Sequence, residues 1–336
     1  MNLNDEVFDT KESYECKSSY IICSIPRSGS SLLSYGLTET KIAGIPHEYF
    51  NIMNKDILMP RWNLTTIEEY IAVLLKKRVT ANGWFSLKIH YHQYYENFLH
   101  HAPDKIFPNL KYIYITRRDN IRQSISYLKS IQSGKWTSLD QEYLKPAFDY
   151  KRIKGYQSQM DSEEKGWETY FKQKEIEPLR IIYEDFVLSY SDTILKVLNF
   201  LGIEIPETLQ IAAPKIQKQA DDLTENWYQL FLTHEAPEKT LRQANLALEK
   251  DNFLEAENLF SLLCQYDTSN PEYQYYLGIT QFNQEKYDPA LNSFFTGLKQ
   301  GLLNSDICNY LGKCLERIGE KDTAELFFKQ AKELLN

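Results

Sequence analysis

The chain has 336 residues, of which 43% are hydrophobic and 25% charged, a composition that is typical of a globular protein and excludes a disordered or fibrous chain. The net charge of −8 argues against a protein that binds duplex nucleic acid, because such proteins neutralise phosphates with clustered Lys and Arg. The sequence has no signal-peptide pattern and no apolar run of about eighteen residues, so we expect a soluble, cytoplasmic protein without a membrane span.

Short apolar segments alternate with helical patterns over residues 18–235, after a polar tail at residues 1–17. The apolar segments are YIICSI, WFSLKIHY, LKYIYITR and PLRIIYED, and the helical patterns include IEEYIAVLLKKR and DTILKVLNFLG. Strands that alternate with helices predict a parallel sheet with crossover helices, so we expect an α/β domain over residues 18–235. Ligands of such sheets bind at the carboxyl ends of the strands.

The first apolar segment ends in a short turn that leads into a helix. After Pro26 the turn reads Arg27, Ser28, Gly29, Ser30 and Ser31. The N–H groups and the dipole at a helix N-terminus favour anions, and glycine lets the backbone approach a ligand closely. The turn therefore favours phosphate-like oxygens, with an ordinary capped helix start as the simpler alternative. It is not a Walker A loop, because the Lys and the magnesium-binding hydroxyl of that motif are missing.

His90 lies in the second apolar segment and His92 directly after it, where strand alternation would place both on one face. No third ligand is near them, and the five cysteines contain no C-x-x-C pair and are odd in number. We therefore expect neither a metal site nor a disulfide framework.

The third apolar segment ends in Arg117 and Arg118, and Ser126 lies about two turns into the next helix. This arrangement predicts a second cationic site. One of the two arginines could instead pair with Asp119 or with a carboxylate at the surface.

The C-terminal region, residues 236–336, repeats with a period of 34 residues. Ala256, Ala290 and Ala324 keep this period, as do Phe260, Phe294 and Phe328 and the Leu-Gly pairs at 277–278 and 311–312. The pattern resembles the tetratricopeptide repeat (TPR), a pair of helices in which small residues permit close crossing. We expect an all-α domain of three repeats at about 237–270, 271–304 and 305–336; the first has Gln243-Ala244 in place of Leu-Gly. The repeats either bind a protein partner or self-associate, or they only extend the first domain.

The α/β domain resembles a sulfotransferase that uses 3′-phosphoadenosine 5′-phosphosulfate (PAPS). In that family a P-[KR]-S-G-[ST]-[ST] loop, here Pro26–Ser31, cradles the 5′-phosphosulfate. The resemblance implies that Arg117 and Ser126 bind the 3′-phosphate and that Tyr183, in a Y-E-D motif before a helix ending in F-L-G, lies near adenine. It also implies the sulfotransferase fold, a P-loop-NTPase-like parallel sheet flanked by helices.

The Stf0 branch of this family, which includes trehalose sulfotransferases, is the most similar. Three of its motifs appear in order, as GIPHEYF at 44–50, RRDNIRQSIS at 117–126 and QADDLTENW at 219–227. The resemblance implies that Lys218, Gln219 and Ala220 lie in a loop that closes over the nucleotide. The repeats lie outside this pattern and are an addition to it.

The resemblance leaves two candidates for the general base. Glu48 corresponds to the base of the Stf0 branch, and His90 corresponds to the base of cytosolic sulfotransferases of animals. We favour Glu48 because several neighbouring positions match. Arg27 would stabilise charge on the leaving group without acting as an acid, and Lys88 would be a third cation near the sulfuryl group. PAPS would be the donor co-substrate and 3′-phosphoadenosine 5′-phosphate (PAP) the product, with no metal.

The acceptor would be a hydroxyl, or an amine, of a sugar, a glycolipid or a small specialised metabolite. The aromatic residues that could line its site are Tyr49, Phe50, Trp62, Trp84, Tyr91, Tyr94 and Tyr95. Two other functions remain open: a non-catalytic nucleotide-binding TPR scaffold and a P-loop nucleotide kinase. The presence of Arg27, Glu48, His90, Arg117 and Ser126 argues against the scaffold, and the missing Lys-[ST] pair argues against the kinase.

Overall fold

The computed structural model describes residues 4–10, 12, 14–98, 102–215 and 221–335. The chain divides into two compact units, Met1–Asp221 and Asp222–Asn336, and each has a hydrophobic core of its own. The first unit contains the strands, and the second consists of helices.

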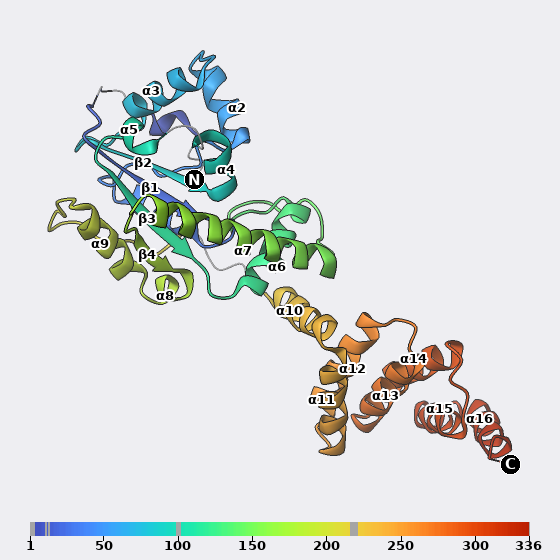
Figure 1. Cartoon of the computed structure of the whole chain (residues 1–336). Coiled ribbons are helices and arrows are strands. Elements are labelled where there is room, and N and C mark those ends of the chain that lie inside the picture. Colours follow the sequence, from blue (N-terminus) through green and yellow to red (C-terminus); the bar gives the residue numbers. More distant parts are fainter. Residues whose placement is uncertain (1–3, 11, 13, 99–101, 216–220, 336) are drawn as a thin grey trace. The chain divides into compact units, whose positions relative to one another are not determined.

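The sheet of the first unit has four parallel strands in the order β2-β1-β3-β4 (Figure 1). The strands are β1 (Ser18–Ser24), β2 (Trp84–His90), β3 (Leu110–Thr116) and β4 (Leu179–Ile182). Each comes from one of the apolar segments, which are rich in the Ile, Tyr and Phe residues that favour strands. Because every pair is parallel, the carboxyl ends lie along one edge of the sheet, and the expected α/β fold is confirmed.

Helices connect the strands and cover the sheet. They are η1 (Glu6–Phe8), α1 (Ser30–Glu39), α2 (Ile52–Arg61), α3 (Ile67–Lys77), α4 (Tyr91–Phe98), α5 (Pro103–Ile106), α6 (Asn120–Ser133), α7 (Tyr150–Gln173), α8 (Tyr183–Leu188) and α9 (Tyr190–Leu201). Residues 134–149, between α6 and α7, form a long connection without a helix or strand.

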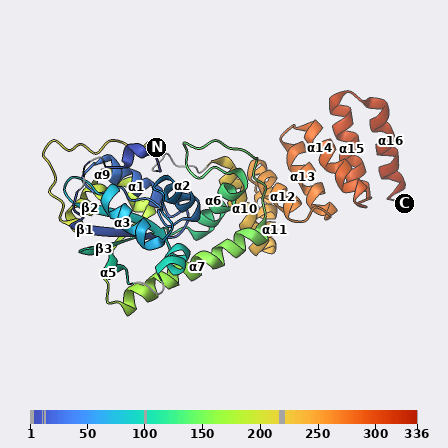
Figure 2. The ribbon, with the colours of Figure 1, turned by 90° about the horizontal axis from the view of Figure 1, so that it is seen from above.

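Successive residues of β1 belong to two different cores, because side chains alternate across a strand. Ile21 and Cys23 are buried in one core, to which α7 contributes Trp167. Tyr20 and Ile22 are buried in the other core, to which α1 and α9 contribute. Figure 2 shows α7 on one side of the strands and α1 and α9 on the other. The sheet is therefore the middle layer of three.

The second unit contains three helix pairs that fall within the three expected repeats. After α10 (Asp222–Glu235) come α11 (Pro237–Glu249) with α12 (Phe253–Tyr266), α13 (Pro271–Asn283) with α14 (Tyr287–Lys299), and α15 (Ser305–Ile318) with α16 (Lys321–Glu333). The expected all-α helical-repeat fold is confirmed. α10 packs against α11 and α12, so its contacts place it with the helix pairs.

The repeated glycines explain why the helices of a pair lie so close together. A Cβ at Gly278 would come within 2.6 Å of the Phe294 ring, and one at Gly312 within 2.5 Å of the Phe328 ring. The Phe of the second helix thus occupies the space that the Gly of the first helix leaves. The first pair uses Ala244 and Phe260, both fully buried in one cluster.

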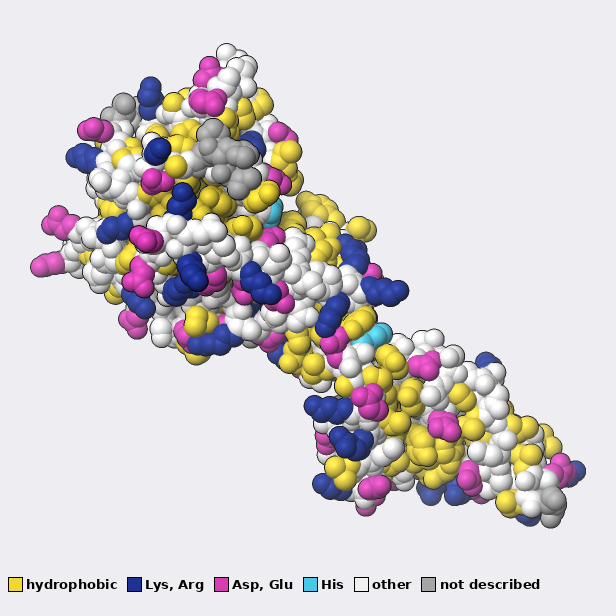
Figure 3. Space-filling model, in the orientation of Figure 1, with side chains coloured by type: hydrophobic (Ala, Val, Ile, Leu, Met, Phe, Trp, Pro, Cys, Tyr) yellow, Lys and Arg dark blue, Asp and Glu magenta, His cyan; other side chains and the backbone are white. Residues whose placement is uncertain are grey.

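The exterior is a mixture of charges. On the face drawn in Figure 3, Lys and Arg side chains are interspersed with Asp and Glu over both units. Among the described residues, no helix combines the length and the apolar character that crossing a bilayer requires.

Candidate active site

The turn between β1 and α1 contains two residues with left-handed backbone conformation, Arg27 (φ 63°) and Gly29 (φ 87°). Gly29 is the N-cap of α1, and no described side chain caps this helix. Ser28 is fully buried, and its Oγ has no hydrogen-bond partner among the described residues. The turn therefore offers a buried hydroxyl and first-turn N–H groups that an anion can bind.

Two buried side chains from other helices hold the backbone that leads into this turn. Trp167 Nε1 of α7 donates to the Ser24 carbonyl at 2.9 Å, and Gln123 Nε2 of α6 donates to the Pro26 carbonyl at 2.7 Å. The sequence analysis missed both residues. Gln123 lies within the RRDNIRQSIS motif, which is a usable signal, whereas Trp167 looks like any apolar position of an amphipathic helix.

Arg27 connects the turn to the cationic segment that follows β3. Its Nε donates to Ser126 Oγ at 2.9 Å, and its Nη1 donates to the Trp136 carbonyl. Burial, and the positive charge of Arg117 nearby, lower the pKa of Arg27 to about 10. The group is still a cation at neutral pH.

Tyr183 completes this side of the site. Arg117 Cζ lies 5.0 Å from the centre of the Tyr183 ring, and Arg117 Nε lies 3.7 Å from Glu184 Oε1. A Cβ at Gly29 would come within 2.4 Å of Tyr183 Cδ2. Gly29 is therefore required both by its backbone conformation and by the aromatic ring beside it.

Arg118 points to a different environment from Arg117. Its side chain is 55% exposed and forms a bidentate pair with Asp185, at 2.9 and 2.6 Å. Asp119 instead pairs with Arg122 at 2.6 Å. Arg118 is thus the arginine that pairs with a surface carboxylate, and Arg117 is the one beside Tyr183.

The two candidate bases are in contact with each other. Glu48 Oε1 lies 2.7 Å from Lys88 Nζ and 3.5 Å from His90 Nε2. Lys88 Nζ also donates to Ser31 Oγ at 2.9 Å, which connects this group to the β1–α1 turn. Glu48, Lys88 and His90 therefore lie next to the β1–α1 turn rather than in a separate site.

Glu48 is an ionised carboxylate. Burial raises its pKa, but the positive charge of Lys88 and contact with His90 outweigh burial and hold the pKa well below its usual range. Its other oxygen, Oε2, accepts hydrogen bonds from Gln93 at 3.0 Å and from Asn51 at 3.3 Å. His90 Nδ1 lies 2.9 Å from Ser24 Oγ, so this ring also has a partner on each side.

His92 does not share a strand with His90, which corrects the sequence-based expectation. β2 ends at His90 and α4 begins at Tyr91, because Gln93 Oε1 accepts from the His90 N–H at 3.1 Å, as the third residue of a capping box does. The two rings remain neighbours, with centres 5.8 Å apart. Within the described ranges, no three His, Cys, Asp or Glu side chains group as metal ligands do.

Most of the aromatic residues expected near an acceptor lie in the cores. Tyr49, Phe50, Trp84 and Tyr94 are buried, Trp62 and Tyr91 pack partly against a core, and Tyr95 is exposed. The expectation was wrong for the four buried residues. Aromatic content alone does not separate core rings from rings of a site.

Lys218, Gln219 and Ala220 lie outside the described residues. Asp221, which follows them, pairs with Lys129 of α6 at 2.6 Å.

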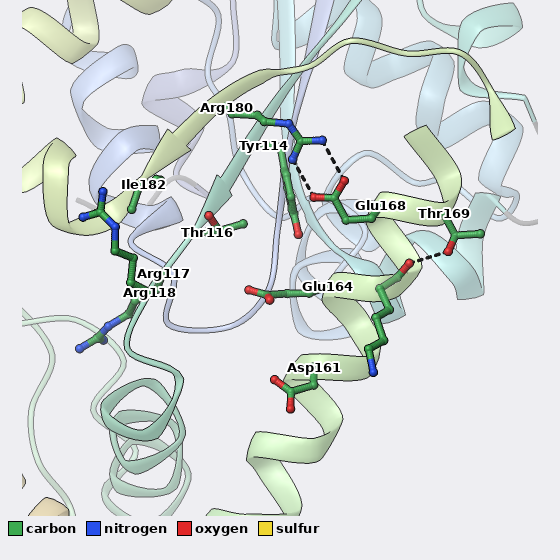
Figure 4. A pocket seen from close by; sticks show the side chains of 11 residues that line it. Tyr114, Thr116, Arg117, Arg118, Asp161, Glu164, Glu168, Thr169, Arg180 and Ile182 are labelled. Carbon is green, nitrogen blue, oxygen red and sulfur yellow. Dashed lines mark hydrogen bonds and ion pairs between the residues drawn. The ribbon is translucent and has the colours of Figure 1, made fainter. Parts of the chain in front are cut away.

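An open cavity lies between α7 and the β3–β4 side of the sheet, with Arg117 at its margin (Figure 4). Its charged side chains include the bidentate pair of Arg180 with Glu168, at 2.6 and 2.8 Å. Burial, and the negative charges of Asp161 and Glu168, raise the pKa of Glu164. The cavity combines both signs of charge and contains none of the residues of the β1–α1 turn.

Comparison with curated proteins finds trehalose 2-sulfotransferases. The enzyme of Mycolicibacterium smegmatis is 21% identical over 252 residues, which cover 63% of this chain and 93% of the relative. The enzyme of Mycobacterium tuberculosis is 21% identical over 258 residues, which cover 65% of this chain and 95% of the relative.

Comparison with solved structures finds helical proteins at low overall similarity. The type III secretion chaperone SycD of Yersinia enterocolitica is 23% identical, covers 30% of this chain and 76% of its own, and has a TM-score of 0.29. The TPR protein YrrB is 24% identical, covers 31% of this chain and 55% of its own, and has a TM-score of 0.29. The family model of the Stf0 sulphotransferases matches residues 19–233, which include β2, β3, β4, all of β1 except Ser18, and the turn at Arg27. The chain therefore belongs to the Stf0 sulphotransferase family.

Proposed function

We propose that the protein transfers a sulfuryl group from PAPS to a hydroxyl of a sugar, with Glu48 as the general base. The observation that carries the proposal is the contact between an anion-binding turn and a carboxylate, made through one side chain. Lys88 Nζ bonds both Ser31 Oγ at 2.9 Å and Glu48 Oε1 at 2.7 Å. A group that binds at the turn is thus one side chain away from a base.

The residues around the turn fit the anionic parts of PAPS. The buried Ser28 Oγ without a described partner and the uncapped start of α1 suit the 5′-phosphosulfate. Arg117 and Ser126 would bind the 3′-phosphate, and Tyr183, beside Gly29 and Arg117, would contact adenine. Lys218, Gln219 and Ala220 would complete the nucleotide site.

The transfer would use these residues as follows. Glu48 accepts the proton of the acceptor hydroxyl, whose oxygen forms a bond to sulfur while the bond between sulfur and the 5′-phosphate oxygen breaks. Arg27, Lys88 and the N–H groups of the turn stabilise the charge that grows on the departing phosphate, and PAP leaves. Arg27 keeps its proton, because a guanidinium is a poor acid even with its pKa lowered to about 10.

His90 remains the second candidate for the base. It shares Glu48 Oε1 with Lys88, and its Nδ1 lies beside Ser24 Oγ. If Ser24 donates to Nδ1, then Nε2 carries the proton and donates to Glu48, which leaves the carboxylate as the base. We favour this tautomer because both Lys88 and His90 then donate a hydrogen bond to Glu48.

The relatives, which are named as trehalose 2-sulfotransferases, support a sugar acceptor. We further propose that the helix pairs bind a protein partner or associate with a second copy of the chain. The cytoplasmic location and the domain boundary near residue 235 stay predictions.

The experiment that tests the donor site is a calorimetric titration of the protein with PAP, with ATP as the control ligand. We expect PAP to bind tightly, ATP to bind much more weakly, and magnesium to make no difference to PAP. Absence of PAP binding would contradict the proposal and leave the turn as an ordinary helix start. Binding of ATP that requires magnesium would favour a kinase instead.

A further inference from the structure

A row of polar side chains continues from the β1–α1 turn through Lys88 to Glu48 and beyond it. Lys88 Nζ and His90 Nε2 both lie against Glu48 Oε1. The His92 ring follows, with its centre 5.8 Å from that of His90, and His92 Nδ1 lies 3.4 Å from Glu163 Oε1. The row therefore extends from the turn past the proposed base.

Packing alone does not explain Glu163. It is 6% exposed on the face of α7 that covers the sheet, between the buried Met160 and Trp167. A carboxylate at such a position costs free energy unless other groups compensate its charge and fill its hydrogen-bonding capacity. His92 compensates the charge, and Gln159 Nε2 donates to Glu163 Oε1 at 2.9 Å. An apolar residue at this position, like those one turn before and one turn after it, would stabilise the core without needing such partners.

Each carboxylate of this row has a partner that can carry a positive charge. Glu48 has Lys88, and Glu163 has His92, whose pKa is raised by its hydrogen bond to Glu163. A site for a protonated amine needs a buried carboxylate without such a partner; the two carboxylates of the row each have one, and Glu96, whose charge also raises the pKa of His92, is exposed to solvent. The groups that remain accessible are hydrogen-bonding groups, since the His92 side chain is 40% exposed. Such groups suit hydroxyls, which both donate and accept.

Aromatic rings from two helices and a loop lie near the same row. The Tyr127 ring of α6 is 4.8 Å from Tyr156 of α7 and 6.0 Å from Trp136. Burial raises the pKa of the Tyr127 hydroxyl, and the negative charges of Glu163 and Glu48 raise it further. Rings of this kind pack against the C–H faces of a sugar.

We propose that His92 and Glu163 bind the acceptor through hydroxyls other than the one that reacts, and that they select a neutral polyol over an amine. The inference rests on the proposed sulfuryl transfer, and it assigns the end of the acceptor site that is distant from the donor.

The test is a transfer assay with the full-length protein and radiolabelled PAPS. Trehalose is the neutral probe and cyclohexylamine the cationic probe. We expect transfer to trehalose, and we expect Glu163→Gln and His92→Gln each to raise the KM for trehalose about tenfold or more, with a much smaller fall in kcat. The matched control is Glu164→Gln, one residue further along α7 in the cavity of Figure 4, which should leave KM unchanged.

Three outcomes would overturn the inference. They are an unchanged KM in both variants, transfer to cyclohexylamine but not to trehalose, and PAP binding without transfer to trehalose. A purely structural pair would lower the melting temperature and leave KM alone, and His92→Gln decides the question if Glu163→Gln does not fold. Absence of PAP binding by the wild-type protein would instead contradict the proposed donor site.

Discussion

The two sides of the candidate site differ in how their charges are compensated. At the turn, two guanidinium groups lie close to neutral partners: Arg27 Nε donates to Ser126 Oγ, and Arg117 lies over the Tyr183 ring. Along β2 and α7, Glu48 lies 2.7 Å from Lys88, and Glu163 lies 3.4 Å from His92. Neighbouring cations favour an anionic ligand, whereas paired groups leave hydrogen-bonding capacity for a neutral one. Under our proposal, the turn binds the anionic donor and the row binds the neutral acceptor.

Lys88 belongs to both sides, because it contacts Ser31 of the turn and Glu48 of the row. An anion at the turn would compete with Glu48 for this ammonium group. Donor binding would then weaken the contact that holds the pKa of Glu48 low, and the carboxylate would become a stronger base. The base would thus be activated only when the donor is present.

The largest effect should come from Glu48→Gln, which removes the base and keeps the shape of the side chain. We expect turnover to fall by about a hundredfold or more, without any loss of affinity for PAP. The measurements are single-turnover transfer from labelled PAPS and calorimetry with PAP. His90→Gln is the matched variant, and a larger loss in His90→Gln than in Glu48→Gln would move the base to His90.

The next effect should be on the donor side. Arg27→Ala and Arg117→Ala each remove a charge-assisted contact, so the Kd for PAP should rise by about 10- to 100-fold, equivalent to about 1.5–3 kcal/mol. Arg118→Ala is the matched control, because Arg118 is exposed and pairs with Asp185. Equal losses in Arg117→Ala and Arg118→Ala would mean that general positive charge, and not this site, binds the nucleotide.

A smaller effect should follow from Gly29→Ala. The substitution strains a left-handed backbone by about 1–2 kcal/mol, and it also displaces the Tyr183 ring, which a Cβ would approach to 2.4 Å. Gly202 has a similar φ of 78° with no atom within 4 Å of the added Cβ. Gly202→Ala should therefore lower the unfolding free energy by a similar amount and leave the PAP affinity unchanged, whereas Gly29→Ala should lower both. Equal PAP affinities in the two variants would remove Tyr183 from the nucleotide site.

The features that the sequence predicted well are those with a local or periodic origin. The 34-residue period arises because the same contact between two helices recurs in successive helix pairs, such as the contact of Gly278 with Phe294. The strands follow from short runs of residues that favour strands, and the turn follows from Arg27 and Gly29 at a strand end. These patterns are contained within a few tens of residues.

The features that the sequence left open depend on side chains that are distant in the chain. Glu48 and His90 appeared as alternatives, and only the packing of the loop after α1 against β2 shows that they touch. Glu163 carried no signal, because one acidic residue in a long polar helix is ordinary. His92 was misplaced because the strand pattern continues through it, while one hydrogen bond from the His90 N–H to Gln93 starts a helix instead.

The smallest expected effect is on the pH dependence of the unfolding free energy, and it comes from His47. His47 lies beside Lys88, and burial together with that positive charge lowers its pKa to about 3. As the pH falls below about 6.5, His47 takes up a proton in the unfolded chain but stays neutral in the folded chain. The free energy of unfolding therefore decreases as the pH falls below about 6.5. Between pH 7 and pH 5.5 this group alone should cost about 1 kcal/mol of unfolding free energy.

Denaturant unfolding of the wild type and of His47→Gln at both pH values measures this contribution, because Gln does not titrate. We expect the variant to lose less stability on acidification than the wild type. His92→Gln should behave in the opposite way: its pKa is raised by the contact with Glu163, so its contribution is complete below pH 6.5 and is lost as the pH rises through the folded pKa. Equal pH dependence in the two variants would contradict the lowered pKa of His47 or the raised pKa of His92.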